Sequence, residues 1–169
     1  IFFELLPKKA VVSDINKNLI NVYLTIKENP KDLIAITKLK YHEYFSLPYS
    51  KEKKNNYERE KYFYTARHNY NSIKYSDKDS PNRLECASLF LFLNKTQYGG
   101  IYRENKSGKY NTPFGNYKTI SFNNILVEKI SEYFNKNNIE IFAQSYEKTL
   151  EYANKKYSDG IIYLDPPYY

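Results

Sequence analysis

Three short apolar runs, each ending in polar residues, constrain the fold of this chain more than any other feature. The first is KKAVVSDI at 8–15, a β-branched core followed by an acid, and the others are IEIFAQS at 139–145 and GIIYLD at 160–165. All three are typical of buried β-strands. Helical periodicity separates them, and this alternation of strands and helices predicts an α/β sheet built from the two ends of the chain.

The segments between these runs carry apolar residues at helical spacing. The first long helix should begin at its cap Asn16 and end at Pro30, which also suits the first turn of the next helix. The most apolar helix is predicted at 83–95 and should be buried. Helices are predicted in all at 1–6, 16–29, 30–47, 51–74, 83–95, 123–137 and 146–156.

Glycine is concentrated in one part of the chain. Four of the five glycines lie within residues 96–118, so the composition of this stretch differs from that of the helical segments before it. Within this stretch IYREN and KYNTP flank a Lys-Ser-Gly turn, which predicts a β-hairpin with Gly108 near its tip. We therefore expect residues 38–118 to form an inserted helical subdomain with a hairpin, and residues 1–37 and 119–169 to form the α/β domain.

The charge and the aromatic content suggest a partner. The chain has 26 Lys and Arg against 19 Asp and Glu, a net charge of +7, together with 20 Tyr and 10 Phe. A basic surface attracts polyanions, and aromatic rings can stack on nucleic-acid bases. A genome rich in AT would give the same bias toward Lys, Asn, Ile and Tyr, so composition alone leaves both explanations open.

The composition also excludes several classes of protein. The single cysteine, Cys86, excludes an internal disulfide framework and a Cys-rich zinc site, and two histidines, His42 and His68, are too few for most His-built metal sites. We therefore expect no metal. No apolar run approaches the roughly 20 residues of a membrane-spanning helix, so no membrane association is expected. The chain has no Met, and we expect it to be a fragment at its front.

The motif LDPPY at 164–168 places a carboxylate at the carboxyl end of a predicted strand, where open α/β sheets bind ligands. Pro166 and Pro167 have fixed φ angles and no backbone N–H, so the loop is stiff and its carbonyls are left to accept hydrogen bonds. Tyr168 adds a flat aromatic face. Together with Asp165, these groups suit a planar ligand that carries an NH2 group, such as adenine; an ordinary strand-to-loop exit is the alternative.

GIIYLDPPY in this setting resembles the catalytic loop of the N6-adenine DNA methyltransferases, and the chain resembles their Dam-type (D12 class) group. VVSDINKNLINVYLTIKENP at 11–30 is similar to the family's second sheet strand and the helix after it. Residues 92–118 are similar to its target-recognition hairpin, with the pattern LNRxGYNGLYRxNxxGxFNxPFGxYK. The resemblance covers nearly the whole chain. It implies an α/β fold with a Rossmann-like, S-adenosylmethionine-dependent methyltransferase sheet. Residues 38–118 would then be the inserted target-recognition subdomain.

The resemblance implies that the hairpin binds double-stranded DNA. Arg103 would contact a guanine through O6 and N7, and Tyr98 would lie beside the vacated base stack. Lys95 stands where the family often has Arg, and Gly99 where it often has Asn; the lysine keeps phosphate binding without bidentate geometry. GATC is the expected recognition sequence. The expected DNA-binding residues are Lys95, Tyr98, Ile101, Arg103, Asn105, Pro113 and Lys118, and Lys106 and Lys109 can also meet phosphates.

The resemblance also implies the reaction, a methyl transfer from S-adenosylmethionine to N6 of an adenine that is flipped out of the duplex. Asp165 and the Pro166 carbonyl would accept hydrogen bonds from the N6 amine, while Tyr168 would stack on the base. Pro167 completes this expected catalytic loop. Because the amine attacks the methyl group directly, no covalent enzyme intermediate is needed, and catalysis would come from positioning and electrostatics.

For the cofactor, the resemblance implies a site at the carboxyl end of the sheet. Asp14 would contact S-adenosylmethionine through the ribose hydroxyls, and Asp165 would also lie in the cofactor site. Gln144 or Ser145 would approach the cofactor's adenine. The protein is expected to act as a monomer in the cytoplasm and to be encoded by a bacterium or a phage.

Two other functions stay open. A methyltransferase acting on another amine or amide, in RNA or in protein glutamine, would not be expected to carry the Arg103 hairpin. A non-catalytic DNA-binding module would have no affinity for S-adenosylmethionine. The family's Gly-rich cofactor loop before FFEL and its segments after DPPY are not in this chain. We therefore expect an excerpt that is inactive alone, from a restriction–modification, phage or solitary enzyme.

Overall fold

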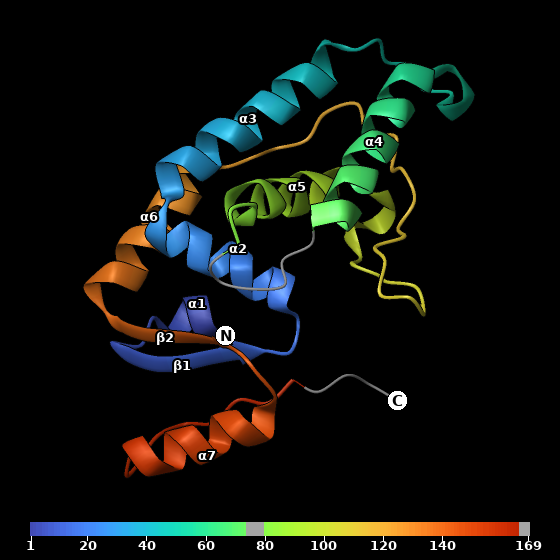
Figure 1. The fold of residues 1–169 in the computed structure, drawn as a ribbon. Helices are drawn as coiled ribbons and strands as arrows, with labels where there is room; N and C mark the ends of the chain where they lie inside the picture. The colour runs from blue at the N-terminus through green and yellow to red at the C-terminus, as the bar shows by residue number, and fades with distance from the viewer. Residues whose placement is uncertain (74–79, 166–169) are drawn as a thin grey trace.

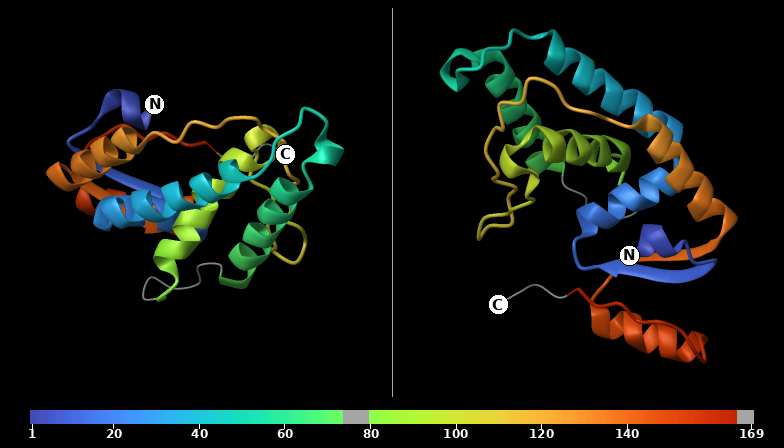
Figure 2. Two further views of the ribbon diagram at one scale, coloured as in Figure 1. Left: turned by 90° about the horizontal axis from the view of Figure 1, so that it is seen from above. Right: turned by 180° about the vertical axis from the view of Figure 1, so that it is seen from behind.

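The computed structural model describes residues 1–73 and 80–165, which form a layer of helices above a small β-sheet (Figure 1). Two further views show that the sheet lies at one end of the molecule, with the last helix beyond it (Figure 2). The elements are α1 (Phe2–Leu5), β1 (Lys9–Asp14), α2 (Lys17–Glu28), α3 (Pro30–Ser46), η1 (Lys53–Asn55), α4 (Tyr57–Ile73), α5 (Arg83–Thr96), η2 (Tyr98–Gly100), α6 (Asn124–Lys136), β2 (Asn138–Ala143) and α7 (Tyr146–Lys156).

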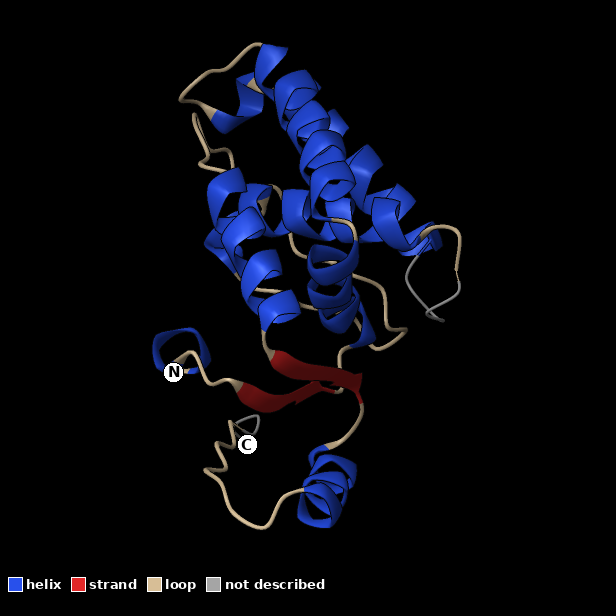
Figure 3. Ribbon diagram, turned by 90° about the vertical axis from the view of Figure 1, so that its left-hand side faces the viewer, coloured by secondary structure: helices blue, strands red, loops and turns tan. Residues whose placement is uncertain are grey.

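The sheet is a parallel pair of strands, in a register that runs from Lys9 opposite Asn138 to Asp14 opposite Ala143. Parallel strands need a crossover connection, and here the crossover contains α2 to α6. α2 and α6 contact the sheet from above, and α7 contacts β1 from below (Figure 3). The described chain is therefore a mixed α/β structure, as predicted, while the complete Rossmann-like sheet and the inserted subdomain stay predictions.

The prediction of a third buried strand in GIIYLD is wrong. Residues 160–164 have no strand conformation, and the side chains of Ile161 and Ile162 are 90% and 60% exposed. An apolar run becomes a strand only when its backbone N–H and C=O groups pair with a neighbour. In the described ranges β1 and β2 pair only with each other, so this segment remains an exposed loop.

The predicted helices form, and their ends follow the expected local chemistry. The Asn16 side-chain oxygen accepts hydrogen bonds from the backbone N–H groups of Asn18 and Leu19, at 3.0 and 3.2 Å, and so caps α2. Pro30 occupies the first turn of α3, where its missing N–H costs no helical hydrogen bond. The stretch 51–74 is helical only from Tyr57, because η1 and its flanking loop come first.

The core of the helical layer is centred on α5, which packs against α2, α3 and α4. Phe92 of α5 is fully buried, and its ring lies 5.5 Å from that of Tyr44 on α3. Tyr44 and Tyr70 are both completely buried. Burial raises the pKa of Tyr44 to about 12, although the nearby Arg59 opposes the shift. Some of the abundant tyrosine therefore serves the core rather than a nucleic-acid surface.

Candidate functional site

The predicted cofactor residues lie together at the carboxyl edge of the sheet. Asp14 ends β1 directly opposite Ala143, and Gln144 and Ser145 follow β2 at once. Because the strands are parallel, their carboxyl ends meet at one edge. The structure thus brings three of the four predicted cofactor residues to the place where open α/β sheets bind ligands.

Side chains from α7 and the turn after β1 fix this edge. Gln144 Nε2 donates to the hydroxyl of Thr149 at 3.1 Å, and that hydroxyl lies 2.7 Å from Ser13 Oγ. On the other side, Asp14 Oδ1 accepts a hydrogen bond from the backbone N–H of Asn16 at 2.7 Å. The pKa of Tyr23 on α2 is raised by burial first and by the charge of Asp14 second. The carboxylate therefore belongs to an ordered, half-buried turn.

The predicted catalytic loop is only partly described. Asp165 is exposed and follows an irregular segment rather than a strand. That segment runs back from the end of α7 toward the side of the molecule on which β1 and β2 end (Figure 1, Figure 2). Pro166, Pro167 and Tyr168 lie outside the described residues, so the roles of all four loop residues stay predictions.

The predicted hairpin forms with Gly108 at its turn. Glu104 and Tyr110 make an antiparallel bridge, and the backbone N–H of Asn105 donates to the Lys109 carbonyl at 2.9 Å. Gly108 donates to the Asn105 carbonyl at 2.9 Å and has a φ of +68°. A hairpin turn with a bulge needs this left-handed conformation, which glycine adopts without strain. The hairpin projects on the side of the molecule where the strands end (Figure 1).

Asn105, a predicted DNA contact, also builds the turn itself. Its side-chain oxygen accepts hydrogen bonds from the backbone N–H groups of Ser107 and Lys109, at 3.0 and 2.9 Å. Asn is favoured in turns for this reason. The side-chain oxygen of Asn105 is thus committed to the hairpin, and any DNA contact would use its NH2 group.

Arg103, the predicted base reader, is exposed and oriented from across the hairpin. Its Nε donates to Oδ1 of Asn111 at 3.0 Å. A hydrogen bond at Nε fixes the plane of the guanidinium, while the terminal NH groups remain the donors that a bidentate contact with guanine uses. The geometry is therefore compatible with reading of a base edge.

Most of the other predicted DNA-binding residues are exposed at the surface. Tyr98 and Ile101 are 69% and 70% exposed, and Lys95 and Lys118 are also exposed. Pro113 is half-buried, and its carbonyl accepts a hydrogen bond from the backbone N–H of Tyr98 at 2.8 Å. Exposed apolar side chains flanked by lysines are typical of an interaction surface.

Two residues of α4 that the sequence did not single out hold the hairpin. Asn71 pairs with the backbone of Tyr110 through both halves of its amide. Arg67 donates to the backbone carbonyl of Thr112 at 3.1 Å and lies 4.5 Å from the ring of Tyr64. The spacing of i and i+4 between Arg67 and Asn71 places both on one helix face, a signal that could have revealed them.

A buried arginine was also missed. Arg59 of α4 is 4% exposed and donates to the carbonyl of Leu47 at 3.0 Å. Its terminal nitrogens reach the carbonyl of Phe45 at 3.3 Å and those of Tyr117 and Lys118 at 3.4 Å. A buried cation needs such partners because desolvation is costly. Arg59 thereby ties the end of the hairpin motif to the α3–α4 connection.

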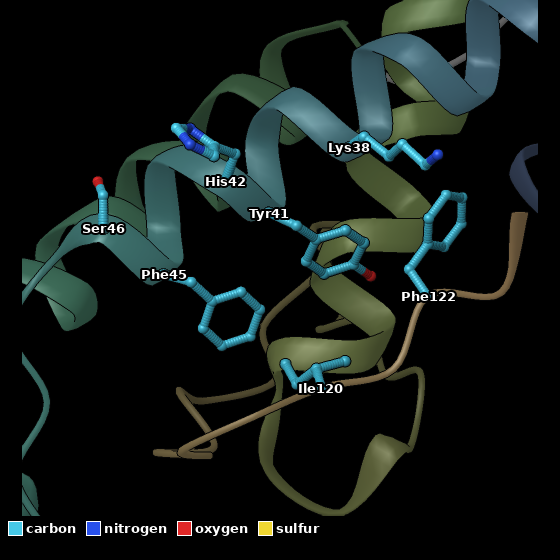
Figure 4. Close-up of a pocket in the computed structure, with 7 residues that line it drawn as sticks. All are labelled: Lys38, Tyr41, His42, Phe45, Ser46, Ile120 and Phe122. Carbon is cyan, nitrogen blue, oxygen red and sulfur yellow. The ribbon is translucent and has the colours of Figure 1, made fainter.

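A groove on α3 contains none of the predicted site residues (Figure 4). It has a volume of about 470 Å³ and lies between α3 and the segment before α6. Tyr41 and Phe45 form its aromatic wall, and the exposed His42 stands at its rim. The Tyr41 hydroxyl donates to the Leu91 carbonyl at 3.2 Å, so this ring serves packing of α3 on α5.

Residues 1–73 and 80–165 offer neither a metal-binding cluster nor a membrane-spanning helix. No group of three His, Cys, Asp or Glu side chains in these ranges could hold a metal ion. The same ranges contain no helix with the length and apolar character needed to cross a membrane. Cys86 is completely buried in α5, where it packs within the core.

Comparison with known proteins gives consistent matches. A family model described as D12 class N6 adenine-specific DNA methyltransferase matches residues 1–169. The chain is 33% identical to the type II methyltransferase M1.LlaDCHI of Lactococcus lactis subsp. cremoris, across 99% of this chain and 52% of that protein. It is 33% identical to the type II methyltransferase M.MjaIII of Methanocaldococcus jannaschii, across 95% of this chain and 50% of that protein. It is 28% identical to a DNA adenine methylase of Haemophilus influenzae, across 95% of this chain and 48% of that protein. The chain thus spans about half the length of these relatives.

Proposed function

This chain belongs to the D12 class of N6 adenine-specific DNA methyltransferases, and we propose that the protein methylates N6 of adenine at a short site in double-stranded DNA. The methyl donor is S-adenosylmethionine, and GATC is the proposed site. The observation that carries the proposal is the exposed Arg103, oriented by Asn111 on a hairpin that projects on the same side as the carboxyl edge of the sheet. A methyltransferase for a small amide would have no use for such a reader.

The chemistry of the carboxyl edge supports binding of S-adenosylmethionine. The Asp14 carboxylate can accept hydrogen bonds from ribose hydroxyls. It lies in a turn that is ordered by the hydrogen bond from the Asn16 backbone N–H to Asp14 Oδ1. Gln144 and Ser145 provide polar side chains beside it for the adenine ring. When bound there, the cofactor supplies an activated methyl group. The protein's own task is to orient it against the target amine.

The target adenine is proposed to be flipped into the loop at Asp165. The Asp165 carboxylate and the Pro166 carbonyl would accept hydrogen bonds from N6 of the adenine. These bonds would make the lone pair of the amine available for attack. Tyr168 would stack on the extruded base. The exposed position of Asp165 supports this role, because a catalytic acceptor must be reachable by a base that arrives from the duplex.

The surface around the hairpin supports a duplex substrate. Lys95 and Lys118 are exposed, as is the proposed reader Arg103, and would neutralise phosphates of the bound duplex. Tyr98 is exposed at the hairpin base, where its ring can take the place of the extruded base in the stack. Two relatives carry the name type II methyltransferase, and a restriction–modification role in a bacterium or phage is proposed on that ground.

A labelling experiment tests the proposed function. The full-length protein is incubated with S-adenosylmethionine carrying a tritiated methyl group and with two duplexes, one containing GATC and one with that site scrambled. We expect label in the GATC duplex alone, and none when its adenine already carries an N6-methyl group. Equal label in both duplexes would contradict the proposed site, whereas label confined to RNA or protein would contradict the proposed substrate.

A further inference from the structure

Arg103 and Asn111 face each other across the hairpin and are joined by two hydrogen bonds. The backbone N–H of Asn111 donates to the Arg103 carbonyl at 3.1 Å, and Asn111 Oδ1 accepts from Arg103 Nε at 3.0 Å. The first bond pairs the two arms of the hairpin, whereas the second restrains an exposed side chain. A free arginine has many rotamers, and it loses this freedom when it binds a ligand. Asn111 therefore removes part of that freedom before any ligand arrives.

The hydrogen bond at Nε also limits which donors Arg103 can offer. A guanidinium has its N–H donors in one plane, and the O6 and N7 atoms of a guanine accept from two of them. With Nε–H directed at Asn111, the N–H groups of the two terminal nitrogens remain for this contact. A bidentate contact of Asn111 with an adenine would need the same Oδ1 that Arg103 engages. Asn111 is therefore suited to act through Arg103 rather than to read a base itself.

Helix α4 and the opposite arm hold the backbone around Asn111. Arg67 Nη1 donates to the carbonyl of Thr112 at 3.1 Å and to that of Asn111 at 3.4 Å. Thr112 is buried, and its hydroxyl donates to the Ile101 carbonyl at 3.0 Å, in the first arm of the hairpin. On the other side of Asn111, the backbone of the buried Tyr110 pairs with a side chain of α4. The Asn111 side chain thus projects from a backbone that is fixed on both sides.

We propose that Asn111 is a positioning residue that sets the specificity of the protein at the base pair read by Arg103. The inference rests on the proposed function, which makes Arg103 the reader of a guanine. Asn111 holds the guanidinium in one plane before DNA binds, so the correct base pair meets a preorganised pair of donors. A wrong base pair forms no bidentate contact and gains nothing from this order. Asn111 therefore contributes to discrimination at one base pair and leaves the others unaffected.

Equilibrium binding of DNA by the full-length protein tests this role, with S-adenosylhomocysteine present throughout. The probes are a duplex with the sequence that the protein methylates and duplexes that each change one base pair of it. Discrimination at a base pair is the dissociation constant of the altered duplex divided by that of the unaltered one. Arg103→Ala identifies the base pair that Arg103 reads, because discrimination there should be lost.

Three further variants are compared with the native protein. Asn111→Ala removes the acceptor for Arg103 Nε. Asn111→Asp keeps an acceptor, and its charge repels the phosphates of every duplex alike, so this repulsion cancels in the ratio. Ser107→Ala is the matched control, because it changes an exposed side chain near the turn of the same hairpin.

In Asn111→Ala we expect discrimination at the base pair read by Arg103 to fall about threefold to tenfold, because a long side chain must then be ordered on binding. Discrimination at the other base pairs should stay within about twofold of the native value, and Asn111→Ala should add no further loss in an Arg103→Ala background. Asn111→Asp and Ser107→Ala should keep the native ratios.

Two results would show that Asn111 only supports the hairpin and would overturn the inference: a loss at every base pair in Asn111→Ala, or a loss of the same size in Asn111→Asp. Native discrimination in Asn111→Ala, or losses that multiply in the double variant, would also overturn it while Arg103 remained the reader. If Arg103→Ala keeps native discrimination at every base pair, or if the native protein binds all the duplexes equally, the proposed function fails as well.

Discussion

The side chain of Asn71 on α4 pairs with the backbone N–H and C=O of Tyr110 in the hairpin, as a neighbouring strand would. Its Nδ2 donates to the Tyr110 carbonyl at 3.0 Å, and its Oδ1 accepts from the Tyr110 backbone N–H at 2.8 Å. A short hairpin is only marginally stable by itself. This single side chain therefore joins the returning strand of the hairpin to the helical layer, and it sets the place from which Arg103 projects.

Loss of this pair should loosen the hairpin. We expect Asn71→Ala to destabilise the hairpin by about 1–3 kcal/mol, because two half-buried backbone groups lose their partners. Hydrogen exchange at residues 103–112 should accelerate, and affinity for the target duplex should fall about tenfold. The matched control is Asn69→Ala on the exposed face of the same helix. Equal effects of the two substitutions would show that Asn71 has no special role.

Gly115 should not tolerate a side chain. A Cβ there would lie 2.4 Å from Cε2 of Tyr117 and 2.7 Å from the carbonyl oxygens of Thr96 and Gln97. Two of these neighbours are backbone atoms, which cannot move aside cheaply. We expect Gly115→Ala to lower the free energy of unfolding by about 2 kcal/mol or more, measured by urea denaturation.

Gly100→Ala provides the comparison for Gly115. A Cβ at Gly100 would meet no atom within 4 Å, although its φ of +67° disfavours any other residue. The cost there should be about 1 kcal/mol, from backbone strain alone. A smaller loss at Gly115 than at Gly100 would contradict the close packing that the structure shows.

Arg103 should carry sequence discrimination, while the exposed Lys118 should carry general affinity. We expect Arg103→Lys to reduce discrimination between target and altered duplexes by about 1–3 kcal/mol, because a lysine cannot form the bidentate contact. Lys118→Ala should weaken both duplexes equally and lower the salt dependence by about one charge. Binding isotherms at several salt concentrations separate the two effects. Unchanged discrimination in Arg103→Lys would remove Arg103 as the reader.

The attachment of α7 to the sheet should weaken in acid. Glu140 of β2 accepts hydrogen bonds from Lys156 at 2.7 Å and Tyr157 at 2.9 Å, and also from Tyr152. Burial acts to raise the pKa of Glu140, but these bonds outweigh it and the pKa is lowered. A lowered pKa stabilises the folded state above the ordinary Glu value of about 4.3, and the stabilisation is lost as pH falls through the folded value.

Glu140→Gln should therefore cost about 1 kcal/mol at pH 7, and the difference from the native protein should shrink below about pH 4. Glu151→Gln is the control, because its pair with Lys155 is 67% and 74% exposed and should contribute almost nothing. Thermal unfolding across this pH range measures both. A pH-independent difference for Glu140→Gln would contradict the role assigned to its charge.

Local sequence patterns predicted most of the helices and strands. The main error, the strand predicted in GIIYLD, arose because strand formation depends on non-local pairing. β1, β2 and the helices follow from apolar spacing, and the Asn16 cap and the Gly108 turn follow from chemistry within a few residues. GIIYLD has the same local pattern as β1 but forms no strand, because strand formation depends on a partner that periodicity does not reveal. Arg59 escaped notice for a related reason, since it bonds to carbonyls of residues 117 and 118 from another part of the chain.

The proximity of the predicted cofactor residues could be predicted from the sequence, because it follows from the topology of the sheet. Asp14 and Gln144 are 130 residues apart in number, yet the parallel register brings their strand ends together, as an α/β fold requires. The loop at Asp165 keeps only its sequence-based assignment.

The most direct measurement is a map of N6-methyladenine in a bacterial host that lacks adenine methylation and expresses the full-length protein. We expect methylation at one short sequence, GATC, in nearly every copy, and none when Asp165→Ala is expressed at the same soluble level. Soluble native protein that leaves the host DNA unmethylated, or an Asp165→Ala variant that methylates it as fully as the native protein, would contradict the account.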